Sequence, residues 1–191
     1  MTTPNVHFGF DIDGTVTDPA TFVPYLNDHF NRSIRLEDIT EYDLTNVLNI
    51  TQEDFWNWMQ QHEHHIYQQA DLAVGVDKAL ESWQQHGRLT YVSARGEHLL
   101  STTKQWLETN NLPYHHIELI GKHDKLESIQ NHNIDIFFED KHDNACDIAE
   151  ACNIPVVLLD TPYNRKPAPE QVVRANNWNE AKAWVDAWLT M

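Results

Sequence analysis

Two aspartates separated by one residue, Asp11 and Asp13, stand at the end of a short apolar run, in the segment FDIDGT. The run, residues 6–12, is rich in β-branched and aromatic residues and ends in Asp-Gly, which predicts a buried strand followed by a turn. Gly14 permits a sharp turn there, and we expect the backbone amides of residues 14–16 to face an anion of phosphate size. The same pattern also occurs in ordinary turns, so the rest of the chain must decide between these interpretations.

A carboxylate such as Asp11 can attack a phosphate dianion only if a cation offsets the repulsion between them, and Mg²⁺ supplies that charge through oxygen ligands. The segment DIDGTVT resembles the first motif of the haloacid dehalogenase (HAD) superfamily, an apolar strand followed by D-x-D-G-[TV]. The resemblance implies that Asp11 forms an aspartyl-phosphate. It also implies that Asp13 protonates the leaving group and then deprotonates the attacking water, which favours hydrolysis over storage of the phosphoryl group.

The superfamily resemblance requires a second and a third motif, and the chain offers a candidate for each. The run Leu89–Val92 ends in SAR, where Ser93 and the amide of Ala94 are expected to hold a phosphoryl oxygen. The segment GKHDKLESI offers two lysines that could neutralise the nucleophile and the phosphoryl group, Lys122 and Lys125. We prefer Lys125, because it stands at the predicted start of the helix that precedes the next strand, where the family places this lysine.

A fourth motif follows the run Ile134–Phe138 in the segment IDIFFEDKHDNA. By its position in the acidic pair, Asp140 resembles the direct metal ligand, and Glu139 would act behind it or through water. Together with the Asp11 carboxylate, the Asp13 backbone carbonyl, waters and a phosphate oxygen, Asp140 would complete the octahedral oxygen shell that Mg²⁺ prefers. Asp143 is an additional candidate, although an acid at the start of a helix also complements the helix dipole without any other role.

Within the superfamily, the chain most resembles the 5′(3′)-deoxyribonucleotidase family and its bacterial nucleotidase relatives, over nearly its whole length. The resemblance rests on DIDGTVTDPATF, VSAR, FFEDKHDNA, DTPYNR and VVRANNW, with Glu139 where those nucleotidases commonly have Asp. It implies a Mg²⁺-dependent phosphatase acting on a nucleoside or deoxynucleoside monophosphate. Two alternatives stay open: a phosphatase for another small metabolite such as a sugar phosphate, and a phosphate-sensing regulatory protein without efficient turnover.

The fold class follows from short apolar runs that alternate with helix-like segments, a pattern typical of a parallel α/β sheet. The resemblance implies a Rossmann-like HAD core with strand order 5-4-1-2-3. The stretch from residue 18 to 85 is far longer than a simple crossover needs, so we expect a helical insertion of the C1 cap type there. The core would then comprise residues 1–17 and 86–191.

The expected cap has predicted helix starts at Asp18-Pro19 and at Thr51, the latter as an approximate capping box. Its large aromatic residues recur at helical spacing, which indicates that most of them form the cap's own core. Phe22 and Trp56 are our candidates for stacking on a nucleobase. Arg95, which completes the second motif, is a further candidate for contact with the substrate.

The composition narrows the range of partners. The formal net charge is −16 and no basic run occurs, which argues against nucleic-acid binding. No stretch is long and apolar enough for a membrane helix and no signal peptide is evident, so we expect a cytoplasmic protein. The chain has twelve histidines, but their spacing matches no zinc framework, so a structural zinc site is not predicted. The oligomeric state stays open, a homodimer included.

Overall fold

The computed structural model of the protein describes residues 5–190, in which short apolar segments form strands and amphipathic segments form helices. The strands are β1 (Val6–Phe10), β2 (Gly87–Ser93), β3 (His116–Leu119), β4 (Ile136–Glu139), β5 (Val156–Leu159) and β6 (Val172–Ala175). The α-helices are α1 (Val23–Phe30), α2 (Leu44–Leu48), α3 (Gln52–Gln69), α4 (Val76–Trp83), α5 (Leu100–Thr109), α6 (Leu126–His132), α7 (His142–Cys152) and α8 (Trp178–Trp188). Two short 3₁₀ turns, Leu36–Asp38 and Glu97–Leu99, complete the set.

The six strands form one parallel sheet in the order β3-β2-β1-β4-β5-β6. The first five strands have the order predicted from the sequence, read from the other edge. The sixth strand, β6, pairs with β5 and was not predicted. The chain moves outward from β1 through β2 to β3, and then crosses back to β4 on the other side of β1. Loops that follow strands on both sides of this crossing meet at the carboxyl edge, where ligands bind in such sheets.

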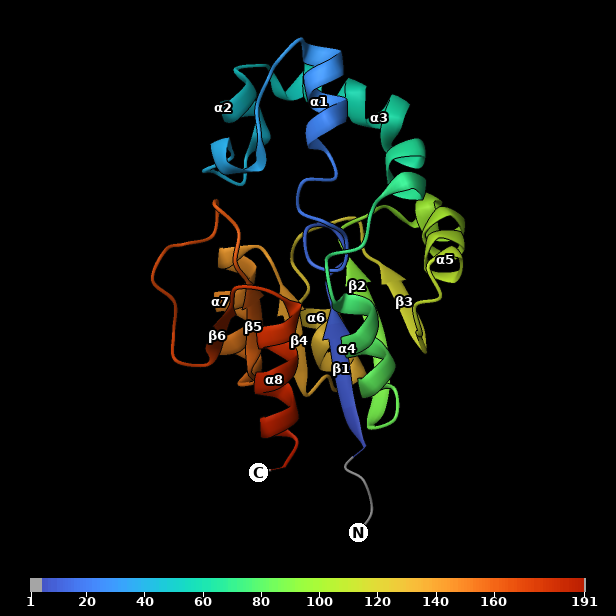
Figure 1. The fold of residues 1–191 in the computed structure, drawn as a ribbon, viewed down its shortest axis with the longest axis vertical. Helices are drawn as coiled ribbons and strands as arrows, with labels where there is room; N and C mark the ends of the chain where they lie inside the picture. The colour runs from blue at the N-terminus through green and yellow to red at the C-terminus, as the bar shows by residue number, and fades with distance from the viewer. Residues whose placement is uncertain (1–4, 191) are drawn as a thin grey trace.

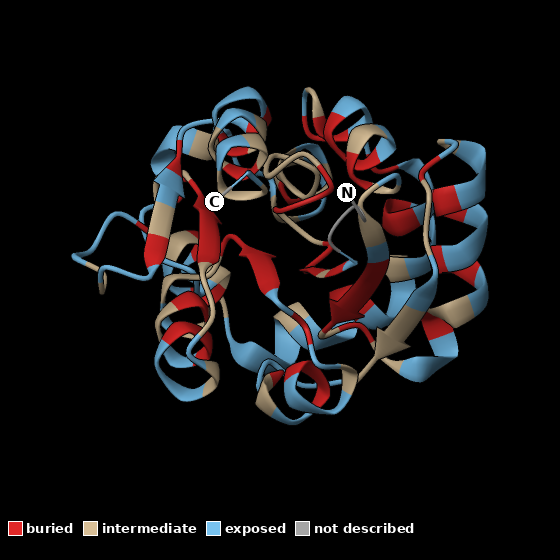
Figure 2. Cartoon of the chain, turned by 90° about the horizontal axis from the view of Figure 1, so that it is seen from below, coloured by how far each residue is buried: buried red, intermediate tan, exposed pale blue. Residues whose placement is uncertain are grey.

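Both faces of the sheet are covered by helices, which explains why β4 and β5 are apolar along almost their whole length. One hydrophobic cluster joins β1 to helices α4, α5 and α8, and a second joins the opposite face to α6 and α7. Figure 2 shows the buried strands between two helical layers, with the buried residues of the helices turned inward. No helix within residues 5–190 is long and apolar enough to cross a membrane.

A separate helical cap lies over the carboxyl ends of the strands (Figure 1). It contains α1, α2 and α3 and has its own hydrophobic cluster, in which Trp58 is 2% exposed. The rings of Phe22, Phe30 and Phe55 surround Trp58. The expectation that most cap aromatics form the cap's own core is therefore confirmed.

Two adjacent segments of the chain form a neck between the cap and the core. Thr17 and Leu72 form an antiparallel bridge, and the amide of Asp18 donates to the carbonyl of Asp71 at 2.8 Å. Helix α4 follows this neck and packs in the cluster of the sheet, where the Trp83 ring stacks on the Phe8 ring. We therefore propose that the cap ends near residue 71 and that α4 belongs to the core, in place of the boundary expected at residue 85.

The two predicted helix starts in the cap had different outcomes. Thr51 caps α3 as predicted, because its hydroxyl accepts from the amide of Asp54 and the Asp54 carboxylate accepts from the amide of Thr51. The start predicted at Asp18-Pro19 is wrong, since α1 begins at Val23. The Asp18 carboxylate instead accepts from the amide of Ala20 at 2.7 Å in a turn that leaves the neck.

Candidate active site

The centre of the site is a buried cluster at the carboxyl ends of β1 and β4. Asp11 follows β1, and Glu139 and Asp140 end and follow β4, so the pairing of these strands brings three carboxylates together. One oxygen from each lies within 4.8 Å of the others. The ammonium group of Lys125, the residue before α6, lies 2.5 Å from Asp11 Oδ1 and 2.8 Å from Glu139 Oε2. Lys125 is 2% exposed, so this cluster is shielded from bulk water.

Asp140 is held by the loop that follows β5. The Tyr163 hydroxyl donates to Asp140 Oδ2 at 2.5 Å, and the Asn164 side-chain amide donates to the backbone carbonyl of Asp140 at 2.7 Å. The same amide group donates to the carbonyl of Leu159 at 2.7 Å, and Asn164 is fully buried. On the other side, the Thr15 hydroxyl bonds to Asp11 Oδ2 at 3.3 Å. The metal-ligand candidates are thus fixed by neighbours from two loops, those that follow β5 and β1.

The electrostatics of the cluster favour the binding of a cation. Burial raises the pKa of Asp11 to about 7, because Lys125 opposes this effect only in part and Glu139 adds to it. Burial and the neighbouring Glu139 and Asp11 raise the pKa of Asp140 well above its usual value. Burial also opposes the charged form of Glu139, but Lys125 outweighs it and lowers the pKa of that carboxyl. Three carboxylates therefore share one ammonium group, and a hard divalent cation with oxygen ligands fits this donor set.

Asp13 points toward the second motif and not toward the other carboxylates. The Arg95 guanidinium donates through Nε to Asp13 Oδ2 at 2.9 Å and through Nη2 to Asp13 Oδ1 at 2.7 Å. Its third contact, from Nη1 to the Thr103 hydroxyl, is 3.0 Å long. The guanidinium also lies 3.8 Å from the centre of the Tyr67 ring in the cap helix α3. Asp13 is thus held in a bidentate ion pair with Arg95. Arg95 in turn contacts Thr103 of the core and Tyr67 of the cap.

Ser93 is the last residue of β2, lines the cavity between core and cap, and is 1% exposed. The expected anion nest is wrong in this structure, because the amides of residues 14–16 are engaged within their own turn. The amide of Gly14 donates to the Thr17 hydroxyl, and the next two amides donate to the carbonyl of Ile12. Gly14 itself is required, because its φ is +81° and a Cβ atom there would lie 2.4 Å from Asp140 Oδ2.

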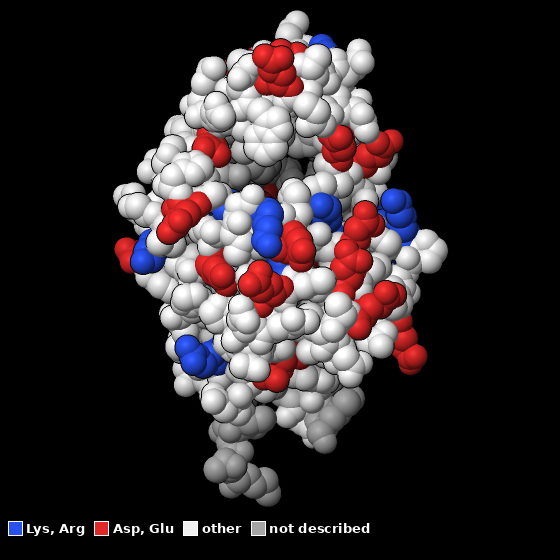
Figure 3. All heavy atoms as spheres, turned by 180° about the vertical axis from the view of Figure 1, so that it is seen from behind, with Lys and Arg blue, Asp and Glu red and all other residues white. Residues whose placement is uncertain are grey.

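A cavity of about 400 Å³ lies between this cluster and the cap, within the size range of small-ligand pockets. Figure 3 shows a hollow between cap and core, with acidic and some basic side chains around it. The lining includes Asp11, Asp13, Ser93, Ala94, Arg95, Lys125 and Asp140, together with the cap candidates Phe22 and Trp56. The two cap candidates differ, since Phe22 packs edge-on against Trp58 and Tyr67, whereas Trp56 is 60% exposed.

The sequence left open whether Lys122 and Asp143 belong to the site, and the structure shows where each lies. Lys122 is exposed and does not line the cavity, whereas Lys125 is buried against Asp11. Asp143 is exposed in the first turn of α7, where its carboxylate bonds to the His142 ring, and it lies outside the cavity lining. The geometry therefore favours Lys125 as the charge-neutralising lysine and gives Asp143 no place at the site.

Sequence reasoning missed the residues that hold the site in position. Tyr163 and Asn164 stand in the segment DTPYNR, which was noticed only as part of a family resemblance. A usable signal was present, because they follow the predicted strand at residues 156–159 and so lie at the same sheet edge as the catalytic candidates. Tyr67 carried no such signal, since nothing in the sequence distinguishes it from its neighbours in the core of the cap.

Several solved structures with this architecture are described as hydrolases of the haloacid dehalogenase class. A haloacid dehalogenase-like hydrolase of Streptococcus pneumoniae aligns with a TM-score of 0.66 at 15% identity, covering 97% of this chain and 100% of that one. The HAD hydrolase YfnB of Bacillus subtilis, described as bound to magnesium, aligns with a TM-score of 0.64 at 12% identity, covering 96% and 99%. The fold of this chain is therefore the HAD fold.

The sequence comparison narrows this class to one family. Residues 5–189 match the model of the family described as 5′ nucleotidase, deoxy (pyrimidine), cytosolic type C protein, and the chain belongs to this family. The protein named "Putative nucleotidase BH1399" of Halalkalibacterium halodurans is 65% identical over 182 residues, which cover 95% of this chain and 93% of that protein. The chain is accordingly a nucleotidase-like hydrolase of phosphate monoesters.

Proposed function

We propose that this protein is a Mg²⁺-dependent phosphatase that hydrolyses nucleoside or deoxynucleoside monophosphates through an aspartyl-phosphate on Asp11. The observation that carries the proposal is the buried contact between Asp11 and the Lys125 ammonium group, beside two further carboxylates and beneath a ligand-sized cavity. A nucleophilic carboxylate next to a fixed cation is the arrangement that attack on an anionic phosphate requires.

In the first half-reaction, one Asp11 oxygen attacks phosphorus and the bond from phosphorus to the leaving oxygen breaks. Asp13 gives its proton to that oxygen, so the product leaves as a neutral alcohol. In the second half-reaction, Asp13 takes a proton from water as the water oxygen attacks the phosphorus of the aspartyl-phosphate. This step releases inorganic phosphate and restores both carboxyl groups. Lys125 offsets the negative charge beside Asp11 in both halves, and Ser93 donates a hydrogen bond to a phosphoryl oxygen.

The residues that would hold Mg²⁺ are Asp11 and Asp140, with the Asp13 backbone carbonyl as a third ligand and Glu139 close behind. The fit rests on the donor set: three buried carboxylate groups within 4.8 Å of one another and a single ammonium group among them. When bound there, Mg²⁺ supplies the positive charge that lets an anionic nucleophile approach an anionic ester. Waters and the phosphorylated substrate would supply the remaining oxygen ligands.

The cap supports a nucleotide as the substrate because it offers an aromatic surface above the reacting carboxylate. Trp56 lines the cavity and keeps 60% of its surface exposed, so its ring is free to stack on a base. Stacking of this kind contributes about 1–3 kcal/mol per base. Phe22 is already in edge-on contact with two cap rings, and we assign it to shaping the cavity wall.

A panel of phosphate esters tests the proposal. Phosphate release would be measured with Mg²⁺ on nucleoside 5′- and 3′-monophosphates, sugar phosphates and an aryl phosphate, with Asp11→Asn as the inactive control. We expect turnover of nucleotides, a loss of several orders of magnitude in Asp11→Asn, and loss on chelation that Mg²⁺ restores. Turnover of sugar phosphates alone would overturn the nucleotide assignment and leave the chemistry standing.

The regulatory alternative predicts a different result for Asp13. A phosphate-sensing protein does not need a proton-transfer carboxylate at that position, so Asp13→Asn would leave phosphate release unchanged. In a phosphatase the same substitution removes the group that activates water. We therefore expect Asp13→Asn to reduce turnover by at least about 100-fold, and acid-quenched protein to retain phosphate on Asp11.

A further inference from the structure

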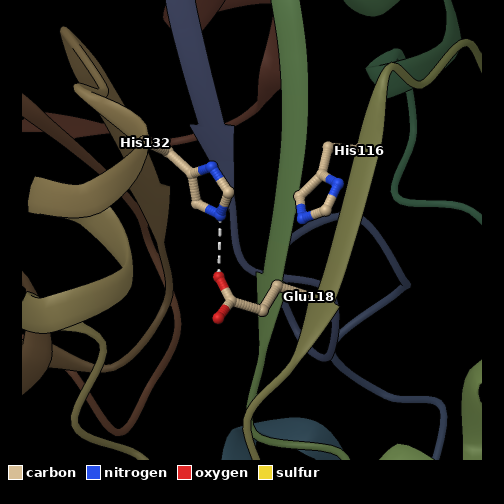
Figure 4. A group of neighbouring side chains, drawn as sticks. All are labelled: His116, Glu118 and His132. Carbon is tan, nitrogen blue, oxygen red and sulfur yellow. Dashed lines mark hydrogen bonds and ion pairs between the residues drawn. The ribbon is translucent and has the colours of Figure 1, made fainter.

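A second group of potential metal ligands lies on the α6 face of the sheet, near its edge. His116 and Glu118 are two residues apart on the edge strand β3, so their side chains point to the same face. His132 is the last residue of α6, which covers that face. Figure 4 shows the two imidazole rings and the Glu118 carboxylate turned into the same gap between strand and helix. Among the described residues, this group and the Asp11 cluster are the two sets with metal-ligand spacing.

The distances are close to those of a coordination site. His132 Nε2 lies 2.9 Å from Glu118 Oε2, and the rings of His116 and His132 have centres 4.7 Å apart. One ligand atom from each of the three side chains lies within 4.8 Å of the others. Ligand atoms around a tetrahedral Zn²⁺ stand about 3.3 Å apart, given metal–ligand bonds of about 2.0–2.2 Å. The proposed site therefore requires these partly exposed side chains to rotate until their ligand atoms reach this spacing.

A third histidine, His7, lies near the group. Its ring centre is 6.3 Å from that of His132, but its Nε2 is already bonded to the Thr90 hydroxyl at 2.7 Å. We therefore do not count His7 among the ligands.

We propose that His116, Glu118 and His132 form a binding site for a transition-metal ion of the Zn²⁺ class, separate from the carboxylate cluster. Two imidazoles and one carboxylate suit Zn²⁺, Co²⁺ and Ni²⁺, whereas Mg²⁺ prefers the all-oxygen cluster. The histidine spacing along the sequence did not indicate a zinc site, because the ligands come from two elements that only the fold brings together.

Such an ion would connect the edge of the sheet to the helix that follows the catalytic lysine. Helix α6 begins directly after Lys125 and ends at His132, so the two sites lie about 10 Å apart along one helix. The ion would fix the far end of α6 to β3. We therefore expect the ion to stabilise this part of the fold. If the contact between Glu118 and His132 is only an ion pair, no metal binding is expected.

The test is a calorimetric titration of the full chain with Zn²⁺ in excess Mg²⁺, which keeps the carboxylate cluster occupied. We expect one Zn²⁺ per chain, and an affinity more than about tenfold weaker in His116→Asn and in His132→Asn. Glu118→Gln is the second variant, because it keeps a hydrogen-bonding group toward His132 and removes the anionic ligand. It should weaken binding without unfolding the protein.

The matched control is His65→Asn, on the exposed side of a cap helix that carries several histidines. This variant should bind Zn²⁺ like the wild type, and Zn²⁺ should raise the melting temperature of both but not that of His132→Asn. Absence of a Zn²⁺ site, wild-type affinity in the three ligand variants, or loss of binding in His65→Asn would each overturn the proposal. Phosphatase activity in Mg²⁺ is measured separately, so its failure is distinguishable from failure here.

Discussion

Substitution of Arg95 tests whether this residue acts on the substrate or through Asp13. Its guanidinium makes two charged hydrogen bonds to Asp13 and one bond to the Thr103 hydroxyl, and it is 3% exposed. Breaking a buried ion pair by removing one partner costs about 3–5 kcal/mol. The Asp13 side chain is 25% exposed, so water can solvate the freed carboxylate. We therefore expect Arg95→Ala to lower the free energy of unfolding by about 3 kcal/mol, the lower end of that range.

Arg95→Ala should also lower kcat strongly. Without the bidentate contact, Asp13 can rotate away from the leaving oxygen, and misplacement by about 1 Å costs on the order of 100-fold in rate. Arg95→Lys keeps the charge but lacks the planar fork, so it should recover only part of the lost kcat. Urea unfolding gives the stability, and kcat and KM on a simple aryl phosphate give the rate.

A double-mutant comparison then decides the role of Arg95. If Arg95 works by positioning Asp13, the double variant Arg95→Ala with Asp13→Asn is no slower than Asp13→Asn alone. The reasoning is refuted if the two losses multiply. A rise in KM with kcat unchanged would also refute it, because either result means that Arg95 contacts the substrate independently, as the sequence analysis suggested.

Three further predictions follow from contacts around the site. Gly14→Ala should abolish activity because the added Cβ would displace Asp140. Gly121→Ala is the control, because Gly121 also has a positive φ but an added Cβ there would have no atom within 4 Å. This variant should stay active and lose only about 1–2 kcal/mol of stability in urea unfolding. Asn164→Leu leaves two buried carbonyls without a donor, so it should cost about 2–4 kcal/mol and weaken Mg²⁺ binding by calorimetry; unchanged Mg²⁺ affinity would contradict the role assigned to it. Thr51→Ala removes the α3 cap and should cost about 1 kcal/mol with normal kcat, and a fall in kcat would mean that the cap helix positions catalytic groups.

The sequence predicted the fold well where local and long-range signals agree. The runs that became β1, β2, β4 and β5 are apolar because both faces of the sheet are covered, and this pattern is visible in a single chain. Strand β6 was missed because it has the partly charged pattern VVRA of an edge strand. Its pairing with β5 is a tertiary feature with little local signal.

The catalytic candidates came together because strand ends in a parallel sheet meet at one edge, which is a property of topology. The details that failed depend on competition between hydrogen-bond partners. The amides of residues 14–16 could face an anion, but Thr17 and Ile12 offer acceptors within the turn. Asp18-Pro19 has the local pattern of a helix start, yet the backbone of Asp18 is held by Asp71 in the neck, so the helix begins later.

Strand β6 follows all four motifs in the chain, yet it supports the geometry of the last one. All four motifs end by Asp140, but Asn164 holds the backbone of Asp140, and Arg174 of β6 donates to the backbone carbonyls of Asn164 and Lys166. A chain cut after β5 would keep every motif residue and lose the support behind the metal-ligand candidate. Surveys that count motifs would score such a fragment as complete, although its last motif would lack a fixed geometry.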